Sequence, residues 1–293
     1  MNIDSFINTI EEKKLKCEGI IVLQHGKKIA EYRWIPEAPR NVFSVSKSFT
    51  SIAIGMAIDR GKLSLSDRVI EAFPDSAREP GKRLSSLTLE HLLTMTRGHS
   101  KFSRPATVAE ALAQPLLYQP GRHFVYDNGS TFLASAMFTR AMGITVRDFL
   151  VDALFRPLGI PDPVWPQSED GHTMGASELI LTTSHLARFG QFLLQRGEWK
   201  ERTRGLKPLV SAEWIDSAGR AHANTTSRQQ DGSLGYGRGF WPCRHGAYRA
   251  DGKDGQFVIV MPLQDAVIAI NSDEPKPYPI LDAVWDEILP VLR

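Results

Sequence analysis

The stretch Asn41-Val42-Phe43-Ser44-Val45-Ser46-Lys47-Ser48-Phe49-Thr50 decides how the rest of the chain is interpreted. Ser44 and Lys47 stand three residues apart, so on a helix they share one face, a turn apart. Apolar side chains continue at helical spacing over 52–57, which predicts a buried helix that ends at Gly61. A serine in the first turn lies among free backbone N–H groups, where negative charge is stabilised. Lys47 would then take the serine proton, as in the Ser-Lys form of an activated nucleophile.

A structural interpretation of Ser44 and Lys47 competes with this one. The serine would cap the helix and the lysine would be solvated. Both residue types are common, so roughly one Ser-x-x-Lys is expected by chance in a chain of this length. Taken alone the motif favours the structural interpretation, and the catalytic one depends on motifs elsewhere in the chain.

The bulk composition is that of an ordinary globular protein. The 293 residues suffice for one large domain or two packed ones, and 42% of them are hydrophobic and 23% charged. A net charge of +2 without a dense Lys/Arg run gives no signal for nucleic acid. Cys17 and Cys243 form no disulfide framework and the histidines lack ligand spacing, so we expect no metal and no cofactor.

The N-terminus, residues 1–5, lacks the basic start and apolar segment of a signal peptide. No stretch of the chain is apolar enough to span a membrane. We therefore expect a cytoplasmic protein without a membrane partner, although a chain trimmed of its leader would look the same.

The order of the expected elements indicates an α/β (α+β) fold. Strands cluster at both ends of the chain, at Glu18–Leu23, Lys28–Trp34, Gly246–Arg249, Gln256–Met261 and Ala266–Asn271. Pairing them in one antiparallel sheet predicts an α/β domain of residues 1–45 and 175–293, flanked by N- and C-terminal helices. Residues 46–174 are expected to form a second, mostly α-helical domain, with its stronger helices at Ser130–Met142 and Thr145–Leu158. Ser44 would lie in the crevice between the two, where sites are usually built.

A second motif, Val125-Tyr126-Asp127-Asn128-Gly129-Ser130, precedes an expected helix. A loop with Tyr126 and Asn128 two apart can aim both side chains the same way. Two nearby ammonium groups would lower the pKa of the Tyr126 phenol, which would then shuttle the Ser44 proton. Asn128 would hold Lys47 or a substrate carbonyl. The competing interpretation is a plain turn with a half-buried ring.

A third motif lies in Ala250-Asp251-Gly252-Lys253-Asp254-Gly255-Gln256-Phe257-Val258, at the entrance to a strand. Gly252 and Gly255 flank Lys253, and glycine suits a backbone that a substrate must approach closely. A strand edge beside the nucleophile would offer an N–H group to an oxyanion. The competing interpretation is a Gly-rich turn with a solvated lysine.

In this order, Ser44-Val45-Ser46-Lys47, Tyr126-Asp127-Asn128 and Lys253-Asp254-Gly255 resemble the three boxes of penicillin-recognising serine enzymes. The Tyr-x-Asn middle box is similar to that of the class C β-lactamase, penicillin-binding protein, D-aminopeptidase and carboxylesterase superfamily. The third box, extended to Gly252–Gln256, resembles that of 6-aminohexanoate-dimer hydrolases. Connecting segments also resemble this superfamily, at Gly61–Asp67, Leu87–Thr96 and Phe155–Ile160. The resemblance implies a β-lactamase/transpeptidase-like fold.

The resemblance also implies roles for the first two boxes. Ser44 would be the acylated nucleophile, with Lys47 and Tyr126 as the proton-transfer pair. Asn128 would support Lys47 and bind substrate. A serine hydrolase that cleaves an ester, amide or β-lactam bond through an acyl-enzyme is therefore the leading hypothesis.

For the third box the resemblance implies that Lys253 adds positive potential near Tyr126. The oxyanion hole would be formed by the backbone N–H groups of Ser44 and Gln256, the residue after Gly255. A true class C-type β-lactamase or a D-stereospecific peptidase is the alternative within the enzymes. A penicillin-binding sensor and a non-catalytic binding protein are alternatives of another class. The expected partner is a small-molecule substrate, and the oligomeric state is left open.

The third box departs from its usual pattern at Asp254, where penicillin-recognising enzymes usually have Thr or Ser. That hydroxyl commonly helps to hold a substrate carboxylate, which Asp254 would repel if it faced the cleft. Asp127 would add a further negative charge. We therefore expect a substrate that is neutral or positively charged beside the scissile bond, such as a neutral ester or amide, rather than a cephalosporin.

Overall fold

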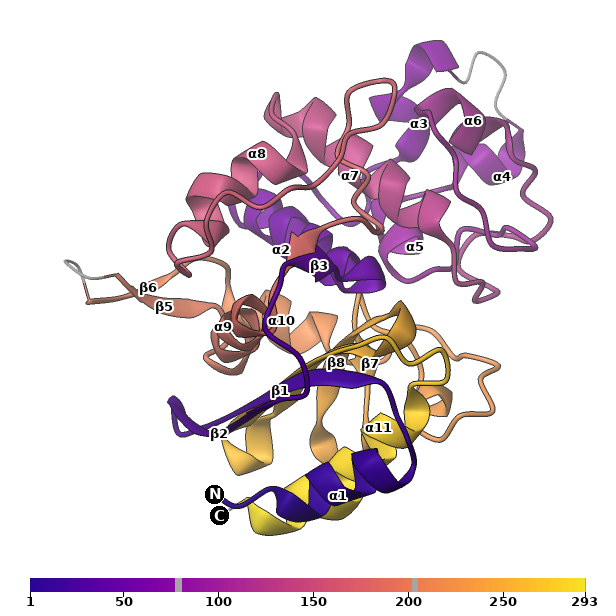
Figure 1. Cartoon of the computed structure of the whole chain (residues 1–293). Helices are drawn as coiled ribbons and strands as arrows, with labels where there is room; N and C mark the ends of the chain where they lie inside the picture. The colour runs from indigo at the N-terminus through magenta and orange to yellow at the C-terminus, as the bar shows by residue number, and fades with distance from the viewer. Residues whose placement is uncertain (77–80, 202–204, 293) are drawn as a thin grey trace.

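The computed structural model describes residues 1–76, 81–201 and 205–292. Figure 1 shows an antiparallel sheet below and a group of helices above it, with both chain ends on the side of the sheet away from the helical group. This mixed architecture confirms the predicted fold class. In the part of the chain described, no helix is both long and apolar enough to cross a membrane.

The main sheet joins the two ends of the chain. It has six strands in the order β2-β1-β10-β9-β8-β7, and every pairing in it is antiparallel. The strands are β1 (Cys17–Gln24), β2 (Lys27–Arg33), β7 (Trp241–Pro242), β8 (Tyr248–Gly252), β9 (Gln256–Met261) and β10 (Ala266–Ser272). The central strands β9 and β10 are buried throughout because both faces of the sheet are covered.

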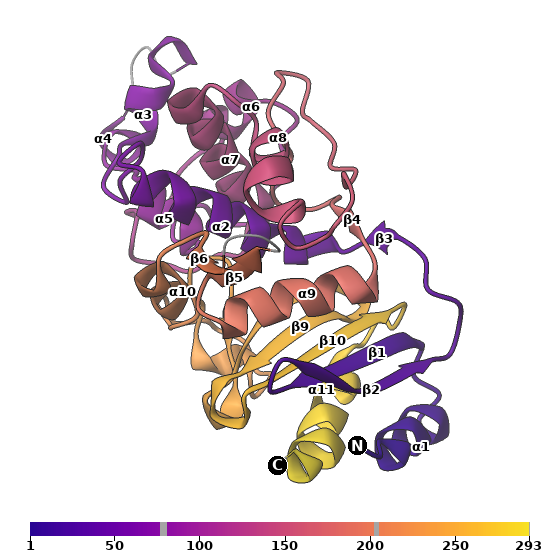
Figure 2. The ribbon, with the colours of Figure 1, turned by 90° about the vertical axis from the view of Figure 1, so that its left-hand side faces the viewer.

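Terminal helices cover one face of the sheet and α9 (Thr183–Leu194) covers the other, as Figure 2 shows. The terminal group consists of α1 (Asp4–Glu12), α11 (Tyr278–Ala283), a π-helical turn η8 (Val284–Ile288) and a final turn η9 (Leu289–Val291). On the opposite face Gly190 lets α9 lie close to the sheet, because a Cβ there would meet Val267 Cγ1 at 2.3 Å. The predicted flanking by both terminal helices is therefore confirmed.

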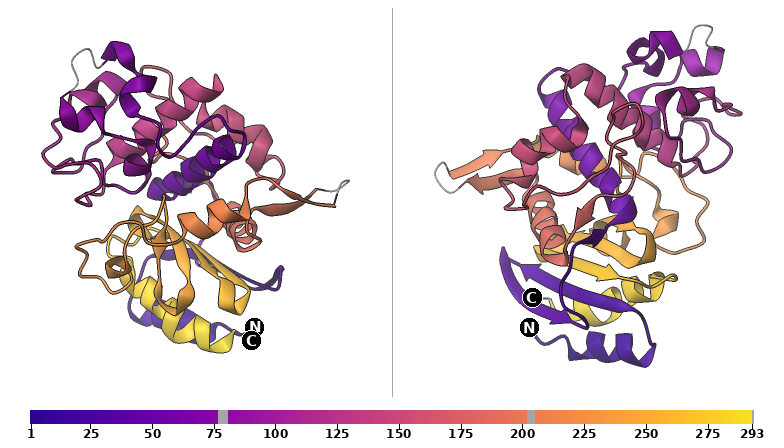
Figure 3. Two further views of the ribbon diagram at one scale, coloured as in Figure 1. Left: turned by 180° about the vertical axis from the view of Figure 1, so that it is seen from behind. Right: turned by 45° about the horizontal axis from the view of Figure 1, so that its top comes forward.

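The helical group is built around two long buried helices, α2 (Ser46–Asp59) and α7 (Asn128–Met142), which pack on each other. Ten of the residues of α7 and twelve of α2 are buried, which explains why neither shows a one-sided apolar stripe. Shorter elements surround them: α3 (Val69–Ala72), η2 (Pro74–Ser76), α4 (Lys82–Ser85), α5 (Leu89–Leu93), α6 (Val108–Ala113), α8 (Val146–Leu150) and the π-helical turn η3 (Val151–Phe155). Figure 3 shows this group from behind and from above.

Several smaller elements were not expected from the sequence. The long segment between α9 and β8 forms β5 (Glu198–Glu201), β6 (Gly205–Pro208), α10 (Ala212–Ala218) and η4 (Gly232–Leu234) before β7. A two-stranded pair, β3 (Arg40–Asn41) with β4 (Ile180–Leu181), links the chain before Ser44 to the chain before α9. The short turn η5 (Arg244–Gly246) closes a hairpin of the main sheet. The turn η7 (Pro262–Gln264) closes the next hairpin, where the sequence does predict a turn between the strands at 256–261 and 266–271.

Two predicted boundaries were wrong. The strand expected at Gly246–Arg249 begins at Tyr248 and runs to Gly252, because 244–246 is taken up by the turn η5. The helix expected from Thr145 to Leu158 is α-helical only to Leu150 and continues as a π-helical turn. The domain limits given above, 1–45 with 175–293 and 46–174, stay a prediction.

Candidate active site

Ser44 lies in a short 3₁₀ turn, η1 (Phe43–Val45), which leads directly into α2. Phe43, just before it, has a φ of +46°, a conformation that a bulky residue rarely adopts. The turn is fixed by Asn41, whose Oδ1 accepts a hydrogen bond from the Phe43 N–H at 2.7 Å. Backbone held in such a sparsely populated region is typical of sites where the surroundings dictate the geometry.

Lys47 is buried, with 1% of its surface exposed. Its Nζ lies 2.9 Å from Ser44 Oγ, 2.7 Å from Asn128 Oδ1 and 2.8 Å from the backbone oxygen of Ala176. Burial lowers the pKa of the Lys47 ammonium to about 7, against the opposing effect of the nearby Asp127 carboxylate. The solvated lysine of the structural interpretation is therefore not what this structure contains.

The three partners of Lys47 suit both forms of its amino group. The ammonium donates to all three oxygens, whereas the neutral amine donates to those of Asn128 and Ala176 and keeps its lone pair for the Ser44 hydroxyl. A base with a pKa near 7 is well suited to take a proton at neutral pH. The contact between Lys47 and Ser44 is thus the geometry of a nucleophile beside its general base.

Tyr126 also meets this pair. Its ring centroid lies 4.8 Å from Lys47 Nζ, and the Ser44 side chain is close enough to act on the pKa of the phenol. Burial raises the pKa of the Tyr126 phenol well above its usual value, and the interaction with Ser44 opposes this only in part. The lowered pKa expected from the sequence is therefore wrong. Desolvation outweighs the positive charges, so Tyr126 is a neutral phenol that can donate a proton.

Lys253 lies at the surface beside the nucleophile turn. Its side chain is 72% exposed, with Nζ 3.1 Å from Asp254 Oδ2 and 5.4 Å from the Phe43 ring. The charges that act on Tyr126 are those of Asp251 and Arg249. The expected positive potential of Lys253 near Tyr126 is corrected accordingly, because the lysine pairs with its own neighbour at the surface.

The glycines of the third box allow a close approach to the nucleophile turn. A Cβ on Gly252 would lie 2.3 Å from the backbone oxygen of Val42, so only glycine fits there. Gly255 has a φ of +87°, which also favours glycine. The Gln256 side chain is buried: its Nε2 donates to the Ser272 oxygen at 2.5 Å. Its side chain is therefore occupied within the sheet, and Gln256 can serve a substrate only through its backbone.

The Asp127 carboxylate is not exposed to the cleft. It is completely buried and caps α7, with Oδ2 accepting the Ser130 N–H at 2.9 Å and Oδ1 the Ser103 N–H at 2.8 Å. Arg97, itself buried, lies 3.4 Å from the same carboxylate. The expected repulsion of a substrate by Asp127 is wrong, because this carboxylate holds the second motif in place from within the helical group.

An aromatic group beside Tyr126 was missed in the sequence. Trp241 lies with its ring centroid 5.7 Å from that of Tyr126, and Tyr236 lies 5.9 Å from Tyr126 and 4.7 Å from Trp241. Phe124 contacts both of the newly found rings. The run Gly235–Trp241 holds three aromatic residues among its glycines, a signal hidden within what the sequence presents as a polar loop.

These observations define a serine-lysine-tyrosine site at the junction of a helical group and an antiparallel sheet. A model of the β-lactamase family matches residues 7–292, so the chain belongs to that family. The family and its structural relatives indicate an enzyme of the serine-hydrolase type.

Two curated relatives illustrate the range of the family. A β-lactamase of Escherichia coli K12 is 27% identical over 191 residues, which are 58% of this chain and 49% of the relative. A monacolin J acid methylbutanoyltransferase of Aspergillus terreus is 24% identical over 156 residues, 43% of this chain and 38% of the relative. The matched region thus spans at most about half the length of these relatives.

Solved structures share the fold at low sequence identity. A Bacillus anthracis protein assigned as a 6-aminohexanoate-dimer hydrolase superposes with a TM-score of 0.81 and 17% identity, over 100% of this chain and 85% of that one. A penicillin-binding protein homologue from Pyrococcus abyssi, described as octameric, gives a TM-score of 0.78 and 18% identity, over 99% and 77% of the two chains.

Proposed function

We propose that this protein hydrolyses an ester or amide bond of a small molecule through an acyl-enzyme on Ser44. The observation that carries the proposal is the position of Lys47, buried and 2.9 Å from Ser44 Oγ with its other two contacts made to oxygens. A neutral lysine next to a serine hydroxyl has few uses in a protein interior other than to take its proton.

In the proposed reaction Lys47 removes the Ser44 proton as Oγ attacks the substrate carbonyl. The negative charge on the carbonyl oxygen is held by the backbone N–H groups of Ser44 and Gln256. Tyr126 gives its phenolic proton to the departing alkoxide or amine and recovers one from the Lys47 ammonium. Water then attacks the acyl-enzyme by the same steps in reverse, which restores the serine hydroxyl.

A neutral substrate suits the third box better than an anionic one. Asp254 has no hydroxyl to offer a substrate carboxylate, and its own charge is paired with Lys253 at 3.1 Å. The one cation of this box is therefore engaged rather than free to bind an anion. A neutral ester or amide is the substrate class we propose, in preference to a cephalosporin.

Two second candidates rest on the relatives. Similarity to the Escherichia coli enzyme supports β-lactam hydrolysis by the same acyl-enzyme. Similarity to the Aspergillus terreus acyltransferase supports transfer of the acyl group to an alcohol in place of water. Both begin with the same attack by Ser44, and they differ only in the substrate or in the group that removes the acyl chain.

Steady-state hydrolysis of a p-nitrophenyl ester and of a chromogenic cephalosporin, with intact-protein mass spectrometry, tests the proposal. Wild type and Ser44→Ala are compared, with Ser46→Ala as a matched control in the same turn. We expect turnover and a mass increase that disappear only in Ser44→Ala. Turnover unchanged in that variant would show the proposal to be wrong, and a mass increase without turnover would identify a penicillin-binding sensor.

A further inference from the structure

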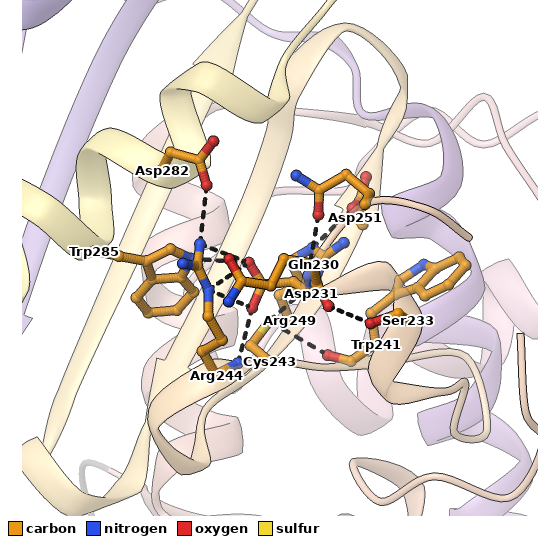
Figure 4. Close-up of polar contacts among 11 residues, drawn as sticks. Gln230, Asp231, Ser233, Trp241, Cys243, Arg244, Arg249, Asp251, Asp282 and Trp285 are labelled. Atoms are coloured by element: carbon orange, nitrogen blue, oxygen red, sulfur yellow. Dashed lines mark hydrogen bonds and ion pairs between the residues drawn. The ribbon is translucent and has the colours of Figure 1, made fainter. Parts of the chain in front are cut away.

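Two clusters of side chains, called units below, stabilise the segment from Asp231 to Asp251 (Figure 4). In each unit an arginine side chain contacts both a carboxylate and the indole ring of a tryptophan. In the first unit Arg244 lies 3.2 Å from Asp231 and 2.9 Å from Asp282, and its guanidinium lies 5.8 Å from the Trp285 ring. The Trp285 Nε1 donates to Asp231 at 3.0 Å. This unit ties the segment to the C-terminal helical turns.

The second unit is built around Arg249, which has 1% of its surface exposed. Its Nε donates to Asp251 Oδ2 at 2.8 Å, its Nη1 donates to Cys243 Sγ at 3.1 Å, and its guanidinium lies 5.8 Å from the Trp241 ring. Trp241 pairs directly with Arg249 between β7 and β8, so their side chains lie on the same face of the sheet.

The second unit differs from the first in what its indole touches. The Trp241 ring centroid lies 5.7 Å from that of Tyr126, and the Tyr126 ring in turn lies 4.8 Å from Lys47 Nζ. A continuous series of contacts therefore runs from the Asp251 carboxylate through Arg249 and Trp241 to the phenol. A buried guanidinium held by a carboxylate has few alternative positions, because each displacement would leave a charge unpaired.

We propose that Arg249 is a positioning residue for Tyr126, acting through the indole of Trp241. The proposal rests on the proposed function, in which the Tyr126 phenol must stay within reach of Ser44 and the leaving group. Arg249 also acts electrostatically, since its charge lowers the pKa of the phenol while Asp251 raises it. Proton transfer depends steeply on distance, and a displacement of about 1 Å can cost on the order of a hundredfold in rate.

The first unit supplies a matched control. Arg249→Met and Arg244→Met each remove one partly or fully buried guanidinium that faces an indole and a carboxylate. Acylation rates are measured with a p-nitrophenyl ester in the native background and again with Tyr126→Phe. We expect Arg249→Met to slow acylation on the order of tenfold to a hundredfold in the native background. With Tyr126→Phe present it has almost no further effect, because the group that it positions is gone.

Two further variants distinguish a positioning role of Arg249 from a purely structural one. Arg244→Met is expected to leave acylation nearly unchanged, and Arg249→Lys to restore part of the loss. Equal losses for Arg249→Met in both backgrounds would overturn the proposal, since they indicate a purely structural role. If Arg249→Met does not fold, Trp241→Phe takes its place in the same pair of backgrounds, with the same expected result.

A readout without catalysis separates this proposal from the proposed function. Near-ultraviolet circular dichroism reports the packing of the Trp241 and Tyr126 rings. We expect its aromatic bands to change in Arg249→Met, and to change little when the same substitution is made in a Trp241→Phe background. A protein that hydrolyses none of the esters but shows this difference would refute the function alone. Unchanged bands in Arg249→Met would refute the positioning role whatever the activity.

Discussion

Replacing Asn128 by Asp tests whether Lys47 acts as a neutral base. The side chains have nearly the same shape, but Asp places a carboxylate where the amide oxygen now lies 2.7 Å from Lys47 Nζ. Wild-type Lys47 has a pKa of about 7, so about half of it is neutral at pH 7. In the proposed reaction the neutral form is the active one, so the acylation rate of the wild type is expected to rise with pH through about 7 and then level off.

The magnitude follows from the distance. Two unit charges about 3 Å apart interact by ~6 kcal/mol at an effective dielectric constant of about 20. Observed shifts beside one opposite charge are smaller, about 1–3 pKa units. A shift of about two units in Lys47 would leave about 1% of the neutral amine at pH 7, a loss of roughly fiftyfold in acylation rate.

The assay is the pH dependence of kcat/KM for a neutral p-nitrophenyl ester. We expect Asn128→Asp to shift the acid limb of this pH profile to higher pH, and we expect the variant to recover most of its activity at alkaline pH. Asn128→Ala, which removes the oxygen without adding charge, controls for the lost hydrogen bond and is expected to shift the limb little. An acid limb that stays in place in Asn128→Asp would refute the assignment of Lys47 as the base.

Three further substitutions test what holds the site together. Asp127→Ala leaves the buried Arg97 cation without its carboxylate and removes the cap of α7, so urea unfolding is expected to show a loss of about 3–5 kcal/mol; a loss below about 1 kcal/mol, the usual value of a surface pair, would contradict the buried pairing. Gly252→Ala forces a methyl group against the Val42 oxygen at 2.3 Å and is expected to lower kcat/KM on the order of tenfold to a hundredfold. Kinetics equal to wild type would show that this contact does not fix the nucleophile turn. The ring of Phe49 is fully buried, and its centroid lies 3.8 Å from that of Phe189 in α9. Phe49→Ala removes this ring, and thermal and urea unfolding are expected to show a loss of about 3–5 kcal/mol in the free energy of unfolding. A much smaller loss would mean that neighbouring side chains move into the space.

Much of the fold was readable from local patterns. β-branched and apolar runs predicted β1, β9 and β10 almost to the residue, because strands that are buried on both faces carry a strong continuous signal. The nucleophile helix and α7 were predicted for a similar reason. The edge strand β2 has no buried residue and was predicted as the second strand of a hairpin with β1. The elements between α9 and β8 were missed, since short strands and turns in a polar, Gly-rich segment owe their conformation to tertiary contacts rather than to periodicity.

The sequence by itself determined which residues belong to the proposed site, because motif spacing and residue type are local properties. Ser44, Lys47, Tyr126 and Asn128 meet in the structure as the three-box resemblance implied. What each group does was decided only by the tertiary structure. Burial lowers the pKa of Lys47 and raises that of Tyr126, which reverses the predicted phenolate.

The same physical reason explains the other corrections. Asp127 and Lys253 are charged residues of the second and third motifs. The effect of such a charge on the site depends on its distance and its exposure to solvent, and both are set by the fold. Packing encloses Asp127 as a helix cap, while Lys253 projects into solvent and pairs with its neighbour. The cation that acts on Tyr126 comes instead from Arg249, which the sequence did not single out. Desolvation and distance depend on residues far apart in the chain, so these properties belong to the folded protein alone.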